Sequence, residues 1–133
     1  MTTLELRDAN VIVRYLVGDT PNLASRAAAL IESTRQLHIP VVILAEVGFV
    51  LTRVYMIDRI RVVEALLDLL GRHNIDPLGI SKDKAIEALQ LCAPSARVSF
   101  ADAMLWAVAH CEVGTVWTFD KRFPAVGIQV YKP

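Results

Sequence analysis

Two hydrophobic patterns alternate along this chain: short continuous apolar runs, and longer stretches in which apolar residues recur every three or four positions. The short runs predict strands at residues 3–7, 38–42, 75–78, 115–119 and 128–131. The longer stretches predict helices at residues 11–17, 21–35, 44–54, 59–73, 82–92 and 100–111. Strands that alternate with helices favour one α/β domain over residues 1–133, an open, mostly parallel sheet with helices on both faces.

Residues that favour helix starts support this division. Thr20, Asp58, Ser81 and Ser99 each precede a predicted helix, and we expect their side chains to act as N-caps. The helical spacing also predicts which residues are buried. The expected buried residues of two helices are Leu44, Val47, Leu51 and Val54, and then Ile60, Val63, Leu66, Leu67 and Leu70.

One acid interrupts the longest apolar run. Residues 41–51 read VVILAEVGFVL, in which Glu46 is the one residue that can carry a charge. Burying an ionised carboxylate costs several kcal/mol unless it is paired or bound to a cation. Arg53, the nearest cation along the sequence, would share a helix face with Glu46 but lie about 10 Å further along the axis. We therefore expect the partner of Glu46 to come from elsewhere in the fold.

Three other acids stand at comparable positions. Asp8 follows the first predicted strand, Asp120 closes the TVWTFD strand, and Asp102 falls in the first turn of its helix. Ligands of open α/β sheets bind beyond the carboxyl ends of the strands, so these acids and Glu46 should point toward one edge. Carboxylates without a basic partner suit Mg²⁺ or Mn²⁺. Such a metal can activate water and neutralise charge on a phosphodiester, which predicts phosphoryl chemistry.

Three of the four acids also have a purely structural interpretation. Asp102 follows Ser99 in SFAD, a capping-box-like helix start in which the dipole favours an acid. Asp8 could be an ordinary helix cap, and Asp120 could sit in the turn FDKR beside a neighbouring cation. Glu46 is the hardest of the four to explain in this way.

The overall composition limits the choice of partners. Fourteen Lys and Arg balance fourteen Asp and Glu, so no global basic field indicates nucleic acid. The hydrophobic fraction of 54% is high, yet no stretch approaches the roughly 20 apolar residues that cross a bilayer. We therefore expect a protein partner and no membrane. Cys92 and Cys111 lie in apolar sequence and no signal peptide is apparent, so we expect reduced thiols and a cytoplasmic location.

The four acidic motifs together resemble a known family. DANVIVRYL at Asp8, AE at Glu46, SFADA at Asp102 and TFDKRF at Asp120 are similar, in this order, to the PIN-domain ribonucleases, especially VapC-like toxins of toxin-antitoxin pairs. The resemblance covers nearly the full chain. It implies a PIN-like fold, cleavage of RNA with Mg²⁺ or Mn²⁺ held by those four acids, and supporting roles for Asn10 and Thr118. A small antitoxin protein and a homodimer are the partners it implies.

The sequence departs from the family pattern at three positions. Ala9 stands where a Thr or Ser is common, Ser99 stands where many members carry a further acid, and Arg7 ends a strand that should be largely buried. Two alternatives remain. One is a non-catalytic interaction domain on the same fold. The other is a phosphoacceptor fold, but a receiver needs an acidic pair after its first strand and a dehalogenase-like phosphatase needs an Asp where Asn10 stands.

Overall fold

The computed structural model describes residues 8–112 and 114–133. These residues form, in chain order, α1 (Ala9–Val17), α2 (Pro21–Ile31), β1 (Leu37–Pro40), α3 (Val41–Phe49), the π-helical turn η1 (Val50–Val54), α4 (Arg59–Leu70), β2 (Ile75–Leu78), α5 (Lys82–Cys92), α6 (Phe100–Glu112), β3 (Thr115–Trp117) and β4 (Gln129–Tyr131). The strand predicted at residues 3–7 lies outside the described residues. All other predicted elements are confirmed in type, although several begin or end at different residues.

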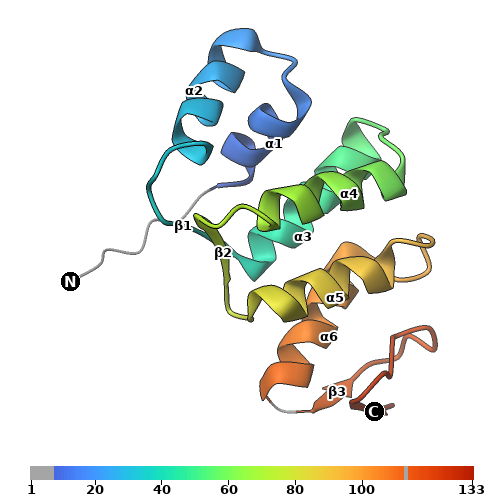
Figure 1. Cartoon of the computed structure of the whole chain (residues 1–133). Coiled ribbons are helices and arrows are strands. Elements are labelled where there is room, and N and C mark those ends of the chain that lie inside the picture. Colours follow the sequence, from blue (N-terminus) through green and yellow to red (C-terminus); the bar gives the residue numbers. More distant parts are fainter. Residues whose placement is uncertain (1–7, 113) are drawn as a thin grey trace.

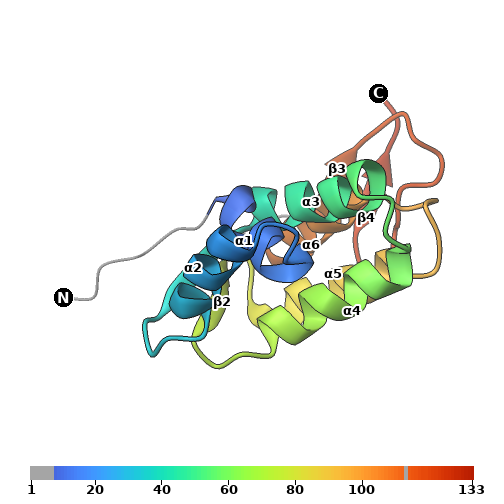
Figure 2. The same ribbon diagram turned by 90° about the horizontal axis from the view of Figure 1, so that it is seen from above.

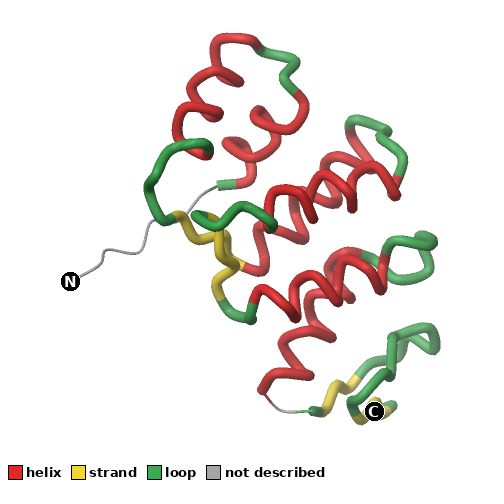
Figure 3. The backbone as a smooth tube through the Cα atoms, viewed as in Figure 1, coloured by secondary structure: helices red, strands yellow, loops and turns green. Residues whose placement is uncertain are grey.

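The described strands form two parallel pairs. Leu37 of β1 lies opposite Ile75 of β2, and Thr115 of β3 lies opposite Gln129 of β4. Parallel pairing confirms the predicted α/β class. The expected single sheet is not continuous within the described part of the chain, where the two pairs lie apart (Figure 3). Helices separate them, because α3 contacts both β1 and α6, while α6 contacts β3.

The helices stack in chain order along the molecule. Figure 1 shows the α1–α2 hairpin at one end, α3 and α4 in the middle, and α5 and α6 beside the C-terminal strands. The view from above shows α4 and α5 side by side (Figure 2). One hydrophobic core runs through this stack, with members from every described helix. Across the described ranges, none of the helices has both the length and the apolar character needed to cross a bilayer.

Two of the four predicted N-caps are confirmed. The Ser81 hydroxyl accepts a hydrogen bond from the Lys84 N–H at 3.2 Å, and the Ser99 hydroxyl accepts one from the Asp102 N–H at 3.0 Å. Thr20 and Asp58 stand at the predicted N-cap positions of α2 and α4, but the expected capping bond is wrong, since neither side chain bonds to its helix among the described residues. At α2 the proline at the first helical position sets the backbone angle for the helix start instead.

Helix α2 ends four residues earlier than its sequence pattern predicts, at Ile31. Asn74, which is 4% exposed, packs against this early end. Its Nδ2 donates hydrogen bonds to the carbonyls of Ile31, Ser33 and Arg35 at 2.9, 3.1 and 3.1 Å. The buried amide thus satisfies one carbonyl at the end of α2 and two in the following loop, and it fixes the turn into β1.

The predicted buried faces hold for most positions. Leu44, Val47 and Leu51 are buried, but Val54 is 66% exposed and Ile60 is 58% exposed, so those two predictions are wrong. A π-helical turn has more residues per turn than an α-helix. Because η1 widens the helix after α3, Val54 is rotated out of the face that 3.6-residue spacing assigns to it.

Candidate functional site

A close contact between α3 and α6 positions two of the four predicted acids. Gly48 of α3 faces the ring of Phe100, which is 3% exposed. A Cβ atom at Gly48 would lie 2.7 Å from Phe100 Cδ2 and closer still to other ring atoms, which is a steric clash. The missing side chain therefore lets the two helices approach. This approach sets the first turn of α6, which carries Asp102, against the helix that carries Glu46.

Arg59 of α4 holds the start of α6 in place. Its Nη1 donates to the carbonyls of Cys92 and Val98 at 2.9 and 3.2 Å. Its guanidinium also lies 4.7 Å from the centroid of the Phe100 ring, a cation–π contact. One side chain thus joins α4 to the α5–α6 connection and to the ring that packs on Gly48.

A hollow of about 490 Å³ lies between α3–η1 and the residues leading into α6. We refer to it as the α3–α6 hollow; its lining includes Glu46, Phe49, Arg53, Arg59, Ser99 and Phe100. Asp102 does not line it but lies one helical turn from Ser99, whose hydroxyl accepts the Asp102 N–H. Glu46 and Asp102 therefore lie on the two helices that enclose one concave space.

The expectation that Glu46 is buried is wrong, because its side chain is exposed. The apolar run splits into two faces of α3. Leu44 and Val47 point into the core, whereas Val42 and Phe49 are 69% and 58% exposed on the same side as Glu46. Periodicity could not separate these faces, since nearly every residue of the run is apolar. The carboxylate thus needs no buried partner, and its significance comes from the α3–α6 hollow that it lines.

The other two acids have local partners. Asp8 is exposed at the N-cap of α1, where its Oδ1 accepts the Asn10 N–H at 3.3 Å. Asp120 Oδ1 accepts the Arg122 N–H at 2.8 Å and lies 3.9 Å from Arg122 Nε, in an exposed ion pair. Thr118 Oγ1 accepts the Asp120 N–H at 3.0 Å, so Thr118 orders the loop that presents Asp120. These contacts match the structural interpretations that the sequence left open for both acids.

The predicted metal-binding acids are not gathered around one point in the described structure. Over residues 8–112 and 114–133, no three His, Cys, Asp or Glu side chains lie close enough to hold one ion. The structure therefore does not bring Asp8, Glu46, Asp102 and Asp120 together as one set. Mg²⁺ commonly binds one or two carboxylates and keeps several waters. The donor chemistry of Glu46 and Asp102, on the helices around the α3–α6 hollow, fits a hard cation of this kind.

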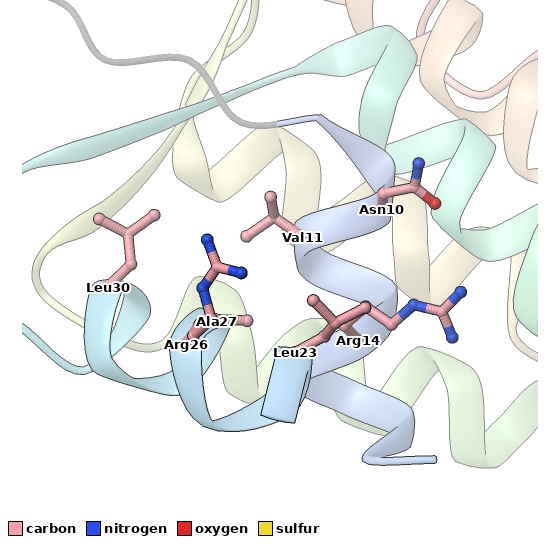
Figure 4. A pocket seen from close by; sticks show the side chains of 7 residues that line it. All are labelled: Asn10, Val11, Arg14, Leu23, Arg26, Ala27 and Leu30. Atoms are coloured by element: carbon pink, nitrogen blue, oxygen red, sulfur yellow. The ribbon is translucent and has the colours of Figure 1, made fainter. Parts of the chain in front are cut away.

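A second hollow of about 470 Å³ lies between α1 and α2. Its polar lining residues are Asn10, Arg14 and Arg26, and its lining includes no acid among the described residues. Figure 4 shows Arg26 extending into the space between the helices, while Arg14 extends away from α2. Arg14 Nη1 is bonded to Asp19 Oδ1 at 3.0 Å and to the Tyr55 hydroxyl at 3.2 Å. Asn10 therefore lies at a different hollow from Glu46.

Comparison with known proteins identifies the family. The model of the PIN domain family matches residues 6–129, so the chain belongs to that family. PIN domains are generally metal-dependent nucleases, which confirms the predicted class of fold and, at this coarse level, a hydrolase. No curated protein and no solved structure matches the chain.

The residues that assemble the α3–α6 hollow were not predicted from the sequence. Gly48 is the clearest case, because a glycine in the middle of an apolar helical run often marks a close approach of another element. The sequence contains no comparable indication of the roles of Phe100 and Arg59. Each depends on contacts between segments that lie far apart in the sequence.

Proposed function

We propose that this protein is a metal-dependent endoribonuclease, the toxin of a VapC-like toxin-antitoxin pair. It hydrolyses RNA phosphodiester bonds with Mg²⁺ or Mn²⁺. The observation that carries the proposal is the position of Glu46 and Asp102 on the two helices around one hollow in a PIN domain. A nuclease needs carboxylates beside a concave, open space; Glu46 lines this one, and Asp102 lies one helical turn from Ser99, which also lines it.

The residues take distinct roles in this proposal. Glu46 and Asp102 would hold the metal from α3 and α6. The sequence pattern adds Asp8 and Asp120 to this set, although the described residues do not gather the four acids around one point. When bound, the metal supplies activated water and neutralises charge that develops on the phosphate. The Thr118 hydroxyl orders the backbone at Asp120, and the Asn10 N–H holds the Asp8 carboxylate at the start of α1.

A second candidate is a non-catalytic PIN-like interaction domain. The local partners of Asp8 and Asp120 favour it, because a capping bond and a turn with an ion pair account for both acids without a metal. Glu46 is the acid that this alternative explains least well, since it lines a hollow beside exposed apolar residues. Nuclease activity separates the two candidates.

Partner binding belongs to the same proposal. Leu23 of α2 is 39% exposed and Ile60 of α4 is exposed as well. These residues lie on two helices that supply apolar surface for a homodimer and for a small antitoxin. Light scattering of the purified protein measures self-association. Co-expression with a candidate small antitoxin protein, followed by purification, shows whether the two proteins bind each other. A monomer at micromolar concentration that captures no such protein would contradict this part.

The activity is tested with purified protein and end-labelled RNA. We expect cleavage of single-stranded RNA or of a structured RNA loop with Mg²⁺ or Mn²⁺, and none in EDTA. An Asp8→Asn plus Asp102→Asn double variant should also be inactive. Cleavage that persists in EDTA, or in the double variant, would exclude the metal mechanism. Sequencing RNA 5′ ends after brief expression in cells would identify the substrate.

A further inference from the structure

An aromatic side chain stands exposed next to the proposed active-site acid. Phe49 follows Glu46 by three residues on α3, so the two side chains share one face of the helix. Both line the α3–α6 hollow, and Phe49 leaves 58% of its surface in water. Burying an aromatic ring is a large favourable term, and the fold leaves this one exposed. An exposed ring at the wall of a hollow is suited to contact with a ligand.

The same hollow has a cation placed for an anionic ligand. Arg53 follows Glu46 by seven residues and also lines the hollow. Its guanidinium makes no hydrogen bond or ion pair with any other described residue, whereas that of Arg59 is already bonded to two carbonyls. The Ser99 hydroxyl accepts the Asp102 N–H and still has its own proton to donate. The lining thus combines an aromatic face, an uncommitted guanidinium and a hydroxyl donor.

We propose that the α3–α6 hollow is a nucleotide subsite for single-stranded RNA, in which Phe49 stacks on a base and Arg53 binds the adjoining phosphate. The proposal deepens the nuclease function above and rests on it for the choice of RNA. A phosphodiester cleaved beside Glu46 has to place a neighbouring nucleotide close by, and the hollow is the concave space there. Base stacking on aromatic side chains and backbone contacts from Arg are the common features of single-strand binding.

The character of the subsite follows from its chemistry. Only an unpaired base has a free face for the Phe49 ring, so duplex RNA should bind more weakly than a single strand. Stacking tolerates every base, since each has a π-face, so this subsite should contribute affinity with little base preference. The volume of about 490 Å³ lies within the range of roughly 300–1,000 Å³ typical of ligand pockets.

The test measures RNA binding without cleavage. A short fluorescein-labelled single-stranded RNA is titrated with the whole protein in EDTA, and again in Ca²⁺, and anisotropy gives the Kd. We expect Phe49→Ala to raise the Kd by about 5- to 150-fold, the range that corresponds to loss of one stacked base. Phe49→Tyr should bind like wild type. Arg53→Ala should weaken binding and lower the slope of log Kd against log salt by about one.

Two matched variants control for changes elsewhere. Val126→Ala removes an exposed apolar side chain outside the hollow, and Arg26→Ala removes an arginine from the α1–α2 hollow. Both should leave the Kd unchanged. If Phe49→Ala binds like these controls, or if wild type does not bind the RNA, the subsite is wrong. A Phe49→Ala variant that turns a dimer into a monomer would assign the surface to a second copy and also overturn the proposal.

These outcomes are separable from failure of the nuclease proposal. Phe49-dependent binding by a protein that never cleaves RNA with Mn²⁺ would keep the subsite and contradict the enzyme. Metal-dependent cleavage by wild type, together with unchanged binding by Phe49→Ala, would keep the enzyme and contradict the subsite.

Discussion

The α3–α6 contact and the C-terminal segment 114–133 hold their acids in different ways. Glu46 and Asp102 lie on two helices whose spacing depends on Gly48 and the ring of Phe100. Asp120 is held by neighbours within two residues, through bonds to Thr118 and Arg122. The first arrangement depends on tertiary packing and the second on local turn chemistry. A change in packing should therefore disturb one region and spare the other.

The largest effect should come from removing acid charge in either region. We expect Asp102→Asn and Asp120→Asn each to lower the rate of RNA cleavage by about a hundredfold or more, because the proposed function makes each acid a metal ligand, and such a ligand supplies several kcal/mol to the transition state. Glu64→Gln, an exposed acid on α4, is the control and should cleave like wild type. Full activity in Asp120→Asn would show that Asp120 is only a turn residue. The α3–α6 region would then carry the active site, and the C-terminal segment would not take part in it.

The next effect concerns the packing of α3 on α6. Gly48→Ala should lower the free energy of unfolding by about 1–3 kcal/mol, because the added methyl group overlaps the buried Phe100 ring. Chemical denaturation measures this change. Gly71→Ala is the matched control, since Gly71 has ordinary helical backbone angles and an exposed position. A Phe100→Leu change should recover part of the loss in the double variant, and additive effects would contradict the proposed contact.

The two cysteines differ in exposure, since Cys92 is buried and Cys111 is exposed. Cys92 is buried near Arg59, and burial raises the pKa of its thiol from 9.0 to about 11, against the lowering effect of the Arg59 charge. The unfolded thiol loses its proton first, so the free energy of unfolding should fall as pH rises from about 9 to about 11. Cys92→Ala should remove this part of the pH dependence.

At neutral pH a thiol reagent should modify the exposed Cys111 and not Cys92. Mass spectrometry of native and unfolded protein measures the difference. Rapid labelling of both thiols in the native protein would contradict the packing described for the end of α5.

The smallest effect should come from the exposed ion pair at the C-terminal segment. Arg122→Ala should change stability by less than about 1 kcal/mol, because Arg122 and Asp120 lie in water 3.9 Å apart. Thermal unfolding measures it, with Lys121→Ala as the neighbouring control. If Arg122→Ala lost several kcal/mol of stability, the turn would have to support the core. The contacts of Arg122, which are local and exposed, do not predict such a loss.

The sequence predicted element types well because they depend on local periodicity. The α5 helix and strand β2 have the predicted bounds, and Ser81 and Ser99 cap as expected. The predictions failed where tertiary contacts decide the outcome. Asn74 bonds to the end of α2 and the loop after it from a position more than 35 residues away, and η1 rotates Val54 out of the core.

The candidate site was only partly predictable for the same reason. The four acids were found from residue type and position, but their relation in space depends on contacts such as Gly48 with Phe100 and Arg59 with the α5–α6 connection. The exposure of Glu46 could not be read from an apolar run in which both helix faces look alike. A pattern therefore identified the residues, while packing determined which of them lie around one hollow.

The most direct test of the central claim is metal binding measured by the melting temperature. Carboxylates that share a cation repel each other without it, so wild type should gain melting temperature in millimolar Mn²⁺ by mass action. Asp102→Asn should melt at a higher temperature than wild type in EDTA and should lose most of the gain in Mn²⁺. If wild type gains nothing from Mn²⁺ and Asp102→Asn is no more stable in EDTA, the acids do not form a metal site and the interaction-domain alternative holds.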